Sequence, residues 1–187
     1  MQCDVRDAAA VEGMVSGAAK TLGGLDVLLH AAGLWQPGIP GQITAEDIDF
    51  LVDTNLKATI FTNQSAYAVM RKSGGGRIIN FGSGEAVMGS PISAVYAATK
   101  GAVSAWTRSI AKAWAAEEIS AIALAPAVQT PGADRCANSS DPRPRSSSTN
   151  RSSPRFRSGA RSETRWLISG RRWCSCAARD LASSPDS

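Results

Sequence analysis

The sequence has few cysteines and no long apolar run. Its four cysteines are spread over 187 residues, whereas small secreted proteins that depend on disulfides carry cysteine far more densely, so a disulfide framework is excluded. No run of apolar residues is long enough to cross a bilayer. The first residues also lack the basic and then apolar pattern of a signal peptide. We therefore expect a cytoplasmic protein that does not enter a membrane.

Basic residues are unevenly distributed along the chain. The net charge is +4, yet residues 1–132 hold nine Lys and Arg against eleven Asp and Glu. Residues 133–187 hold eleven Arg, no Lys and five acidic residues. All of the excess positive charge therefore lies in the second segment, and the composition divides the chain at about Gly132.

The segment 133–187 is poor in residues that build a core. It holds fourteen Ser and only four residues of Leu, Ile, Val and Phe, too little apolar surface to offset the entropy of ordering it. We predict a largely disordered C-terminal tail. It is a nucleic-acid-binding segment rich in Arg and Ser, a solvated linker, or the product of a shifted reading frame. We favour the last, because Arg without Lys and scattered Trp and Cys are typical of GC-rich codons read out of register.

Two kinds of pattern alternate along residues 1–132. Apolar residues at helical spacing and a capping box at Thr44–Asp47 predict helices over 7–23, 44–72 and 93–117. Short apolar runs predict strands over 25–29, 77–81 and 119–125. Because each strand is almost wholly apolar, we expect an α/β fold with a parallel sheet covered on both faces. Ligands bind such sheets at the carboxyl ends of the strands.

Tyr96 and Lys100 are four residues apart in the last predicted helix. This spacing places the phenol and the ammonium on one face of the helix. A free Tyr has a pKa of about 10, and a neighbouring ammonium favours the phenolate and brings that pKa toward neutrality. Alone, such a pair is most often an ordinary surface contact.

Ser83 and Asn55 strengthen the functional interpretation of that pair. Ser83 follows the strand 77–81, where a hydroxyl can bond a substrate carbonyl beside the phenol. Its alternative role is to form a turn between two glycines. Asn55 lies inside a predicted helix, where Asn is a poor helix former and is either exposed or present for a reason.

These residues resemble the short-chain dehydrogenase/reductase family, in its 3-oxoacyl-[acyl-carrier-protein] reductase-like branch. The resemblance covers about residues 3–132. It rests on segments in the family's order, which are Asp4-Val5, Ala31-Ala32-Gly33, Asn55, Ser83, Tyr96-x-x-x-Lys100, Pro126 and Thr130. It implies an NAD(P)-dependent oxidoreductase that moves hydride between nicotinamide and a small-molecule carbonyl or secondary alcohol, without a metal.

The resemblance also implies a role for each residue of the candidate site. Tyr96 would be the general acid/base, and Ser83 would hold the substrate oxygen. Lys100 would lower the pKa of Tyr96 and grip the nicotinamide ribose, and Asn55 would anchor a water of a proton relay. The remaining cofactor contacts are expected at Asp4, Val5, Ala32, Gly33, Pro126 and Thr130. The first two would touch the adenine, the next two the adenosine ribose, and the last two would turn the chain and bind the carboxamide.

Part of the family's pattern is not found in the sequence. No Gly-rich turn that would hold a pyrophosphate precedes Leu25. We therefore expect an N-terminally truncated, partial Rossmann-type doubly wound sheet that lacks strands 1, 2 and 7 of the family order 3-2-1-4-5-6-7. The strand 25–29 would then have an exposed edge. His30 stands where the family usually has Asn, and we predict a hydrogen-bonding residue at the end of that strand.

Assembly and two alternative functions complete the expectations. The family usually forms dimers or tetramers through its two long helices, here 45–72 and 93–117, which implies a possible homo-oligomer. Apolar positions such as Trp106, Ile110 and Trp114 fit an interface and fit core packing equally well, so the sequence does not decide between them. One alternative is an inactive fragment of the same fold that binds no cofactor. The other is a nucleic-acid-binding protein that acts through the Arg-rich tail. The choice between NAD and NADP stays open.

We predict that this chain alone binds NADH and NADPH weakly or not at all, because the turn expected to hold the pyrophosphate is not found. Titration of each nucleotide against the purified protein measures the affinity. A micromolar dissociation constant for either one would contradict the prediction.

Overall fold

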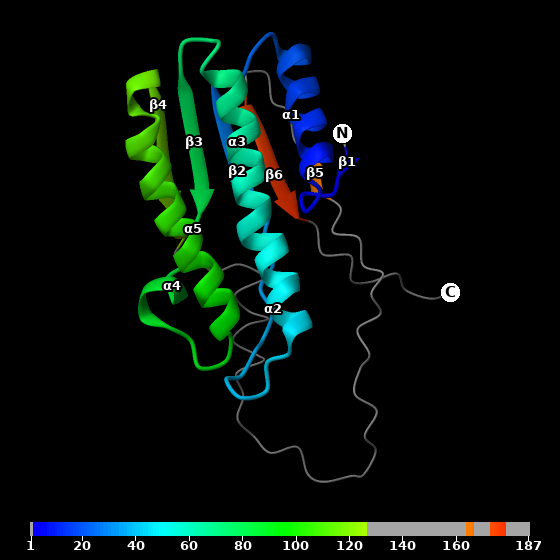
Figure 1. The fold of residues 1–187 in the computed structure, drawn as a ribbon, viewed down its shortest axis with the longest axis vertical. Coiled ribbons are helices and arrows are strands. Elements are labelled where there is room, and N and C mark those ends of the chain that lie inside the picture. Colours follow the sequence, from blue (N-terminus) through cyan, green and yellow to red (C-terminus); the bar gives the residue numbers. More distant parts are fainter. Residues whose placement is uncertain (1, 127–163, 167–172, 179–187) are drawn as a thin grey trace, which may run out of the picture.

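The computed structural model describes residues 2–126, 164–166 and 173–178 (Figure 1). Its helices are α1 (Ala8–Leu22), α2 (Ala45–Leu51), the π-helix η1 (Val52–Lys57), α3 (Ala58–Met70), α4 (Glu85–Met88), α5 (Ala94–Ala113) and the 3-10 helix η2 (Ala115–Glu117). Its strands are β1 (Gln2–Cys3), β2 (Val27–Ala31), β3 (Gly76–Phe81), β4 (Ile119–Leu124), β5 (Thr164–Trp166) and β6 (Trp173–Ala178). The three predicted helices and three predicted strands of residues 1–132 are all present.

The strands form one six-stranded sheet in the order β1-β5-β6-β2-β3-β4. The three strands β2, β3 and β4 are parallel, with Leu28 opposite Ile78 and Ile78 opposite Ala121. Helices connect them, α2 to α3 between the first two and α5 between the last two. The prediction of a partial Rossmann-type parallel sheet is confirmed.

The outer side of β2 is covered by a strand from the C-terminal segment. β6 pairs parallel with β2, from Val27 opposite Trp173 to Ala31 opposite Ala177. β5 pairs antiparallel with both β6 and β1. The prediction of an exposed edge at β2 is therefore wrong. An unpaired strand edge presents backbone N–H and C=O groups that accept an extended segment of almost any sequence.

Two short parts of the C-terminal segment are strands. These are Thr164–Trp166 and Trp173–Ala178, and the prediction of a largely disordered segment over 133–187 stays a prediction for the other residues. Hydrogen bonds between backbones do not require the apolar side chains that this segment lacks. The rest of 133–187 lies outside the described residues, and so do the predicted contact Thr130 and the possible nucleic-acid-binding role.

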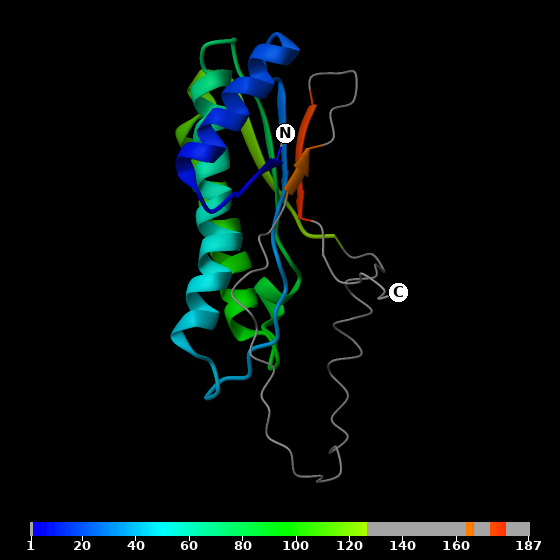
Figure 2. The same ribbon diagram turned by 90° about the vertical axis from the view of Figure 1, so that its right-hand side faces the viewer.

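The described helices cover one face of the sheet (Figure 2). Leu28 and Ile78 face them and are fully buried. On the opposite face, Ile122 and Leu124 are 50% and 47% exposed. The predicted cover is thus found on one face only among the described residues. The chain moves from β2 to β3 to β4 in one direction, and successive right-handed crossovers in one direction place their helices on the same side.

Local signals explain where the helices begin and end. The Asp7 side chain accepts hydrogen bonds from the backbone N–H of Ala9 and Ala10 at the start of α1, and Gly23 ends that helix with φ +76°. The predicted capping box at α2 is present, with Thr44 and Asp47 bonded to each other's backbone. The predicted helix 44–72 is interrupted by η1, a π-helix. None of the described helices is both long and apolar enough to cross a bilayer, and the cytoplasmic location stays a prediction.

His30 is a buried residue of β2. It is 2% exposed, and its side chain lies on the same side of the strand as that of Leu28, toward the helices. Neither ring nitrogen has a hydrogen-bond partner in the described part of the chain, so the predicted hydrogen bond is not found there. Burial, and then the positive charge of Lys100, lowers the pKa of His30 to about 3. The imidazole is therefore neutral at physiological pH.

We predict that His30 makes the protein sensitive to acid. Its pKa falls from 6.5 to about 3 on folding, so below pH 6.5 the unfolded chain takes up a proton that the folded chain does not. The free energy of unfolding should then fall with pH between these values, by up to about 1.4 kcal/mol per pH unit. Urea unfolding of the parent and of His30→Phe at pH 7 and pH 5 measures the effect. Parallel losses in both proteins would contradict it.

Candidate functional site

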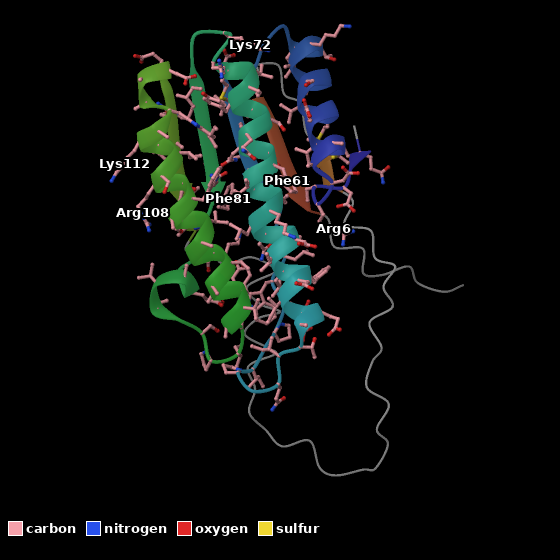
Figure 3. The ribbon with its side chains drawn as sticks, viewed as in Figure 1. Arg6, Phe61, Lys72, Phe81, Arg108 and Lys112 are labelled. Carbon is pink, nitrogen blue, oxygen red and sulfur yellow. The ribbon has the colours of Figure 1, made fainter. Side chains whose placement is uncertain are left out.

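Four of the predicted site residues lie near the carboxyl ends of β2 and β3. Ser83 follows β3, Asn55 lies in η1, and α5 carries Tyr96 and Lys100. Figure 3 shows Phe81 at the end of β3, between α3 and α5. This is the edge of the sheet at which ligands bind in parallel α/β folds.

Lys100 is a buried cation held by the sheet. It is 6% exposed, and its Nζ donates to the carbonyl oxygen of Phe81 at 2.9 Å. Burial lowers the pKa of Lys100 to about 8 because the ammonium loses hydration. An ammonium has three donors, so the bond to Phe81 leaves others for a ligand.

Tyr96 lies one turn before Lys100 on α5 and is partly buried. The Nζ atom of Lys100 is 5.9 Å from the centre of the Tyr96 ring. The phenol and the ammonium are therefore neighbours on one face of the helix, as their spacing predicts. This contact is at the end of α5 that adjoins β3.

Asn55 fastens three segments to one another. It is fully buried, and its side chain accepts from Leu34 N–H at 2.7 Å. Its amide donates to the Leu34 carbonyl at 2.9 Å and to Thr99 Oγ1 at 3.2 Å. These bonds join η1 to the loop after β2 and to α5, so Asn55 is not an exposed residue of a helix. The π-helix around it is a rare conformation that is frequent at functional sites.

Gly33 allows the loop after β2 to approach these groups. A Cβ atom at this position would lie 3.1 Å from Asn55 Oδ1 and 3.2 Å from Lys100 Nζ. Both distances are tighter than ordinary contacts, so a side chain here would displace the amide or the ammonium. The neighbouring Ala32 is 2% exposed. Gly33 is therefore packed against two groups of the candidate site, and the contact of Ala32 and Gly33 with the adenosine ribose stays a prediction.

The hydroxyl of Ser83 has an orientation suited to donation. Its Oγ accepts from the backbone N–H of Glu85 at 3.2 Å, and its carbonyl accepts from Ala86 N–H at 3.1 Å. Ser83 thus does form a turn. Because the oxygen accepts in this turn, the hydroxyl hydrogen is left to donate to a substrate oxygen.

The remaining predicted contacts lie apart from this cluster. The Asp4 carboxylate pairs with Arg6 at 2.7 Å, and the hydrogen bond from the Arg6 side chain lowers the pKa of Asp4. Val5 is 1% exposed, so its side chain belongs to the core. Pro126 is exposed after β4. The Asp4 carboxylate is therefore bonded within its own turn. The adenine contacts of Asp4 and Val5 stay predictions.

The sequence did not indicate that Thr99 belongs to the candidate site. It is 3% exposed, accepts from the Asn55 amide, and donates from Oγ1 to the Tyr96 carbonyl at 2.8 Å. A hydroxyl in a helix usually bonds to its own backbone and carries no further signal. Its second bond appears only when η1 packs against α5.

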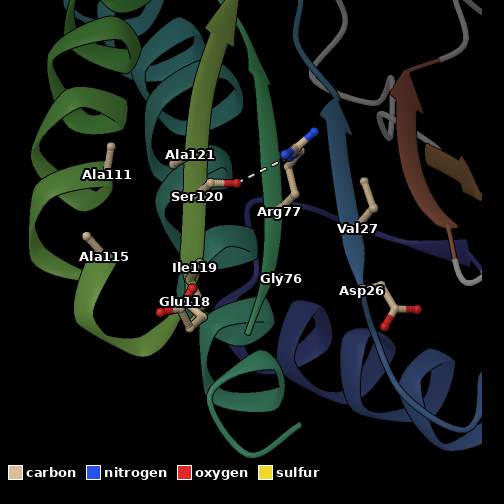
Figure 4. Close-up of a pocket in the computed structure, with 10 residues that line it drawn as sticks. All are labelled: Asp26, Val27, Gly76, Arg77, Ala111, Ala115, Glu118, Ile119, Ser120 and Ala121. Atoms are coloured by element: carbon tan, nitrogen blue, oxygen red, sulfur yellow. Dashed lines mark hydrogen bonds between the residues drawn. The ribbon is translucent and has the colours of Figure 1, made fainter. Parts of the chain in front are cut away.

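A separate hollow of about 670 Å³ lies at the opposite ends of the strands (Figure 4). It is lined by residues that include Asp26, Arg77, Glu118 and Ser120. Within it Arg77 Nε donates to Ser120 Oγ at 3.3 Å. Because it is at the amino ends of β3 and β4, this hollow is distinct from the candidate site.

Known proteins that are similar to this chain include short-chain dehydrogenases and other oxidoreductases. A model of the short chain dehydrogenase family matches residues 1–140. The 3-oxoacyl-[acyl-carrier-protein] reductase FabG of Staphylococcus aureus is 34% identical over 126 residues, 67% of this chain and 51% of the relative. Oxidoreductase asL5 of Sarocladium schorii is 36% identical over 99 residues, 53% of this chain and 40% of the relative. The chain thus spans about half the length of the curated relatives that it matches.

Solved structures with the same fold include two proteins described as short-chain dehydrogenases. One, from Sinorhizobium meliloti, has a TM-score of 0.65 and 36% identity, over 66% of this chain and 49% of that one. The other, from Burkholderia xenovorans, has a TM-score of 0.67 and 26% identity, over 73% of this chain and 55% of that one.

The burial of Lys100 generates a prediction about stability. Its pKa falls from 10.5 to about 8 on folding, so between these values the unfolded chain keeps a proton that the folded chain has lost. The free energy of unfolding should therefore rise with pH from 8 to 10.5, by up to about 1.4 kcal/mol per pH unit. Lys100→Met keeps the length of the side chain and should abolish this rise. Denaturant unfolding of both proteins at pH 8 and pH 10 measures it, and curves of equal slope would contradict the prediction.

Proposed function

This chain belongs to the short-chain dehydrogenase family, and on that premise we propose that it is an NAD(P)-dependent oxidoreductase. It would move hydride between nicotinamide and a carbonyl or secondary alcohol. One observation carries the proposal: Lys100 is bonded to the end of β3 at 2.9 Å, with the Tyr96 ring 5.9 Å away and Ser83 two residues further along the chain. A proton donor, a cation and a hydroxyl donor thus belong to one edge of the sheet.

Each group would have a distinct part in the proton transfer. Tyr96 would give its proton to the substrate oxygen during reduction and take it back during oxidation. The Ser83 hydroxyl would donate a hydrogen bond to the same oxygen and hold it in place. The charge of Lys100 would stabilise the phenolate that remains. Asn55 would fix the loop after β2 against α5, and it would anchor a water of the proton relay.

The cofactor would be NAD or NADP, which supplies the hydride at its nicotinamide ring. One observation fits the nicotinamide end: Lys100 keeps donors for ribose hydroxyls. The phosphate end has no matching element in the part of the chain described before β2, where α1 is preceded by Asp7 and not by a Gly-rich turn. We therefore propose no residue that holds the phosphate end of the cofactor.

The proposed substrate is a small molecule with a carbonyl or a secondary alcohol. This class follows from the chemistry of a phenol and a hydroxyl that share one oxygen. The relative FabG is named a 3-oxoacyl-[acyl-carrier-protein] reductase, and we extend only the carbonyl chemistry of that name to this chain.

We also propose a homo-oligomer formed through the long helices. An apolar groove of about 450 Å³ runs between α2, η1 and α5, lined by residues that include Ile48, Val52 and Val95. Ile48 is 44% exposed. By contrast, Trp106 and Trp114 pack against each other within the chain, with ring centres 6.3 Å apart. The groove, rather than these tryptophans, is the surface proposed to meet a second copy.

Tyr96→Phe should abolish carbonyl-dependent oxidation of NADH or NADPH, by about 100-fold or more, because it removes the transferred proton. Absorbance of the reduced nucleotide with a panel of ketones and aldehydes measures the rate. The other tyrosine provides a matched control, since Tyr67 bonds to Glu117 at 2.7 Å on the exposed side of α3. Tyr67→Phe should keep the activity of the parent. Because weak cofactor binding is predicted above, the nucleotide is raised until the rate no longer increases. Under that condition, equal rates in the parent and Tyr96→Phe, or no activity in the parent, would overturn the proposed function.

A further inference from the structure

Ser93 stands at the N-cap of α5 but does not cap it. A Ser at this position normally accepts a hydrogen bond from a backbone N–H of the first turn. Here the side chain makes no such bond, although Ser93 is fully buried. Its hydroxyl bonds instead to the Glu85 carboxylate and lies 2.7 Å from Ser90 Oγ.

The direction of these bonds follows from the number of hydrogens. A hydroxyl has one hydrogen, and an ionised carboxylate can only accept. Ser93 therefore donates to Glu85 and accepts from Ser90. The carboxylate lies next to the amino end of a 20-residue helix, where negative charge is favoured by the helix dipole.

Both the backbone and the side chain of Glu85 make hydrogen bonds. Its carboxylate accepts from Ser93, and its backbone N–H donates to the Ser83 hydroxyl at 3.2 Å. Glu85 thus joins the turn that carries Ser83 to the first turn of the helix that carries Tyr96. Figure 1 shows α4, which begins at Glu85, beside the start of α5.

A second set of bonds fixes the start of α5 from the other side. The backbone N–H of Gly38 donates to the Ile92 carbonyl at 2.7 Å, and Ala94 N–H donates to the Gly38 carbonyl at 3.2 Å. The start of the helix is therefore held between the loop after β2 and the α4 turn.

We propose that Glu85 and Ser93 are positioning residues that set the distance between the Ser83 hydroxyl and the Tyr96 phenol. We call this pair the Glu85–Ser93 clamp. Ser93 is less than one turn from Tyr96, so a shift of the helix start moves the phenol with it. The part of this inference that concerns catalysis rests on the proposed function. A site that must hold one oxygen between two donors is sensitive to displacements of about 1 Å. This explains why Ser93 bonds to Glu85 and does not cap α5.

Kinetics of four variants test the clamp. Ser93→Ala and Glu85→Ala should each lower kcat about tenfold with little change in KM, because bound substrate is misplaced rather than released. The double variant should be no slower than either single one, since both remove the same bond. Glu85→Gln keeps an acceptor oxygen and should recover most of the activity. Glu12→Ala, which changes an exposed acid of α1, is the control and should match the parent.

Hydrogen exchange gives a measurement that does not require activity. In Ser93→Ala, the amide of Glu85 should exchange about tenfold faster, because the turn that bonds it to Ser83 is released, while amides of α1 are unchanged. Unchanged exchange at Glu85 would overturn the clamp, as would additive losses of kcat in the double variant. If the parent turns over no substrate, the proposed function fails, and the exchange of the Glu85 amide alone decides whether the clamp exists.

Discussion

The bond from the Lys100 ammonium to the Phe81 carbonyl organises the candidate site. An ammonium at this depth loses most of its hydration, and burial lowers its pKa to about 8. A carbonyl at the end of β3 replaces part of that hydration at 2.9 Å. The bond attaches α5 to the sheet and so places Tyr96 one turn away. Gly33 is compatible with this arrangement because a side chain there would meet the ammonium.

Buried amide and hydroxyl side chains also bond α3 and α5 to β3. Asn63 of α3 and Asn80 of β3 exchange hydrogen bonds of 3.0 and 2.8 Å, and Asn80 also donates to Thr107 of α5 at 2.9 Å. All three side chains are buried, so a shift of either helix would leave polar groups unpaired. This network fixes α3 and α5 on β3. It thereby fixes the helix that carries Lys100 and the helix that directly follows η1, where Asn55 lies.

Local features of the sequence predicted the central strands, the helices and the Tyr96–Lys100 face, because each depends on spacing within one element. Features that depend on how elements meet were not predicted. The single covered face follows from the direction of the crossovers, and β6 joins β2 through backbone bonds that leave little trace in side chains. The burial of His30 was not predicted for the same reason, because it depends on the helices that cover the strand. Thr99 and Glu85 gain their second bonds only across elements.

Three local rules are broken where the candidate site lies. A helix expected to be regular contains the π-helix 52–57, Ser93 does not cap its own helix, and Lys100 is buried with no carboxylate bonded to it among the described residues. Each departure is unfavourable for stability considered alone. Sequences that fit their fold depart from such rules mainly where function requires it. All three departures lie near the carboxyl ends of β2 and β3, which is the end of the sheet to which the proposed function assigns the reaction.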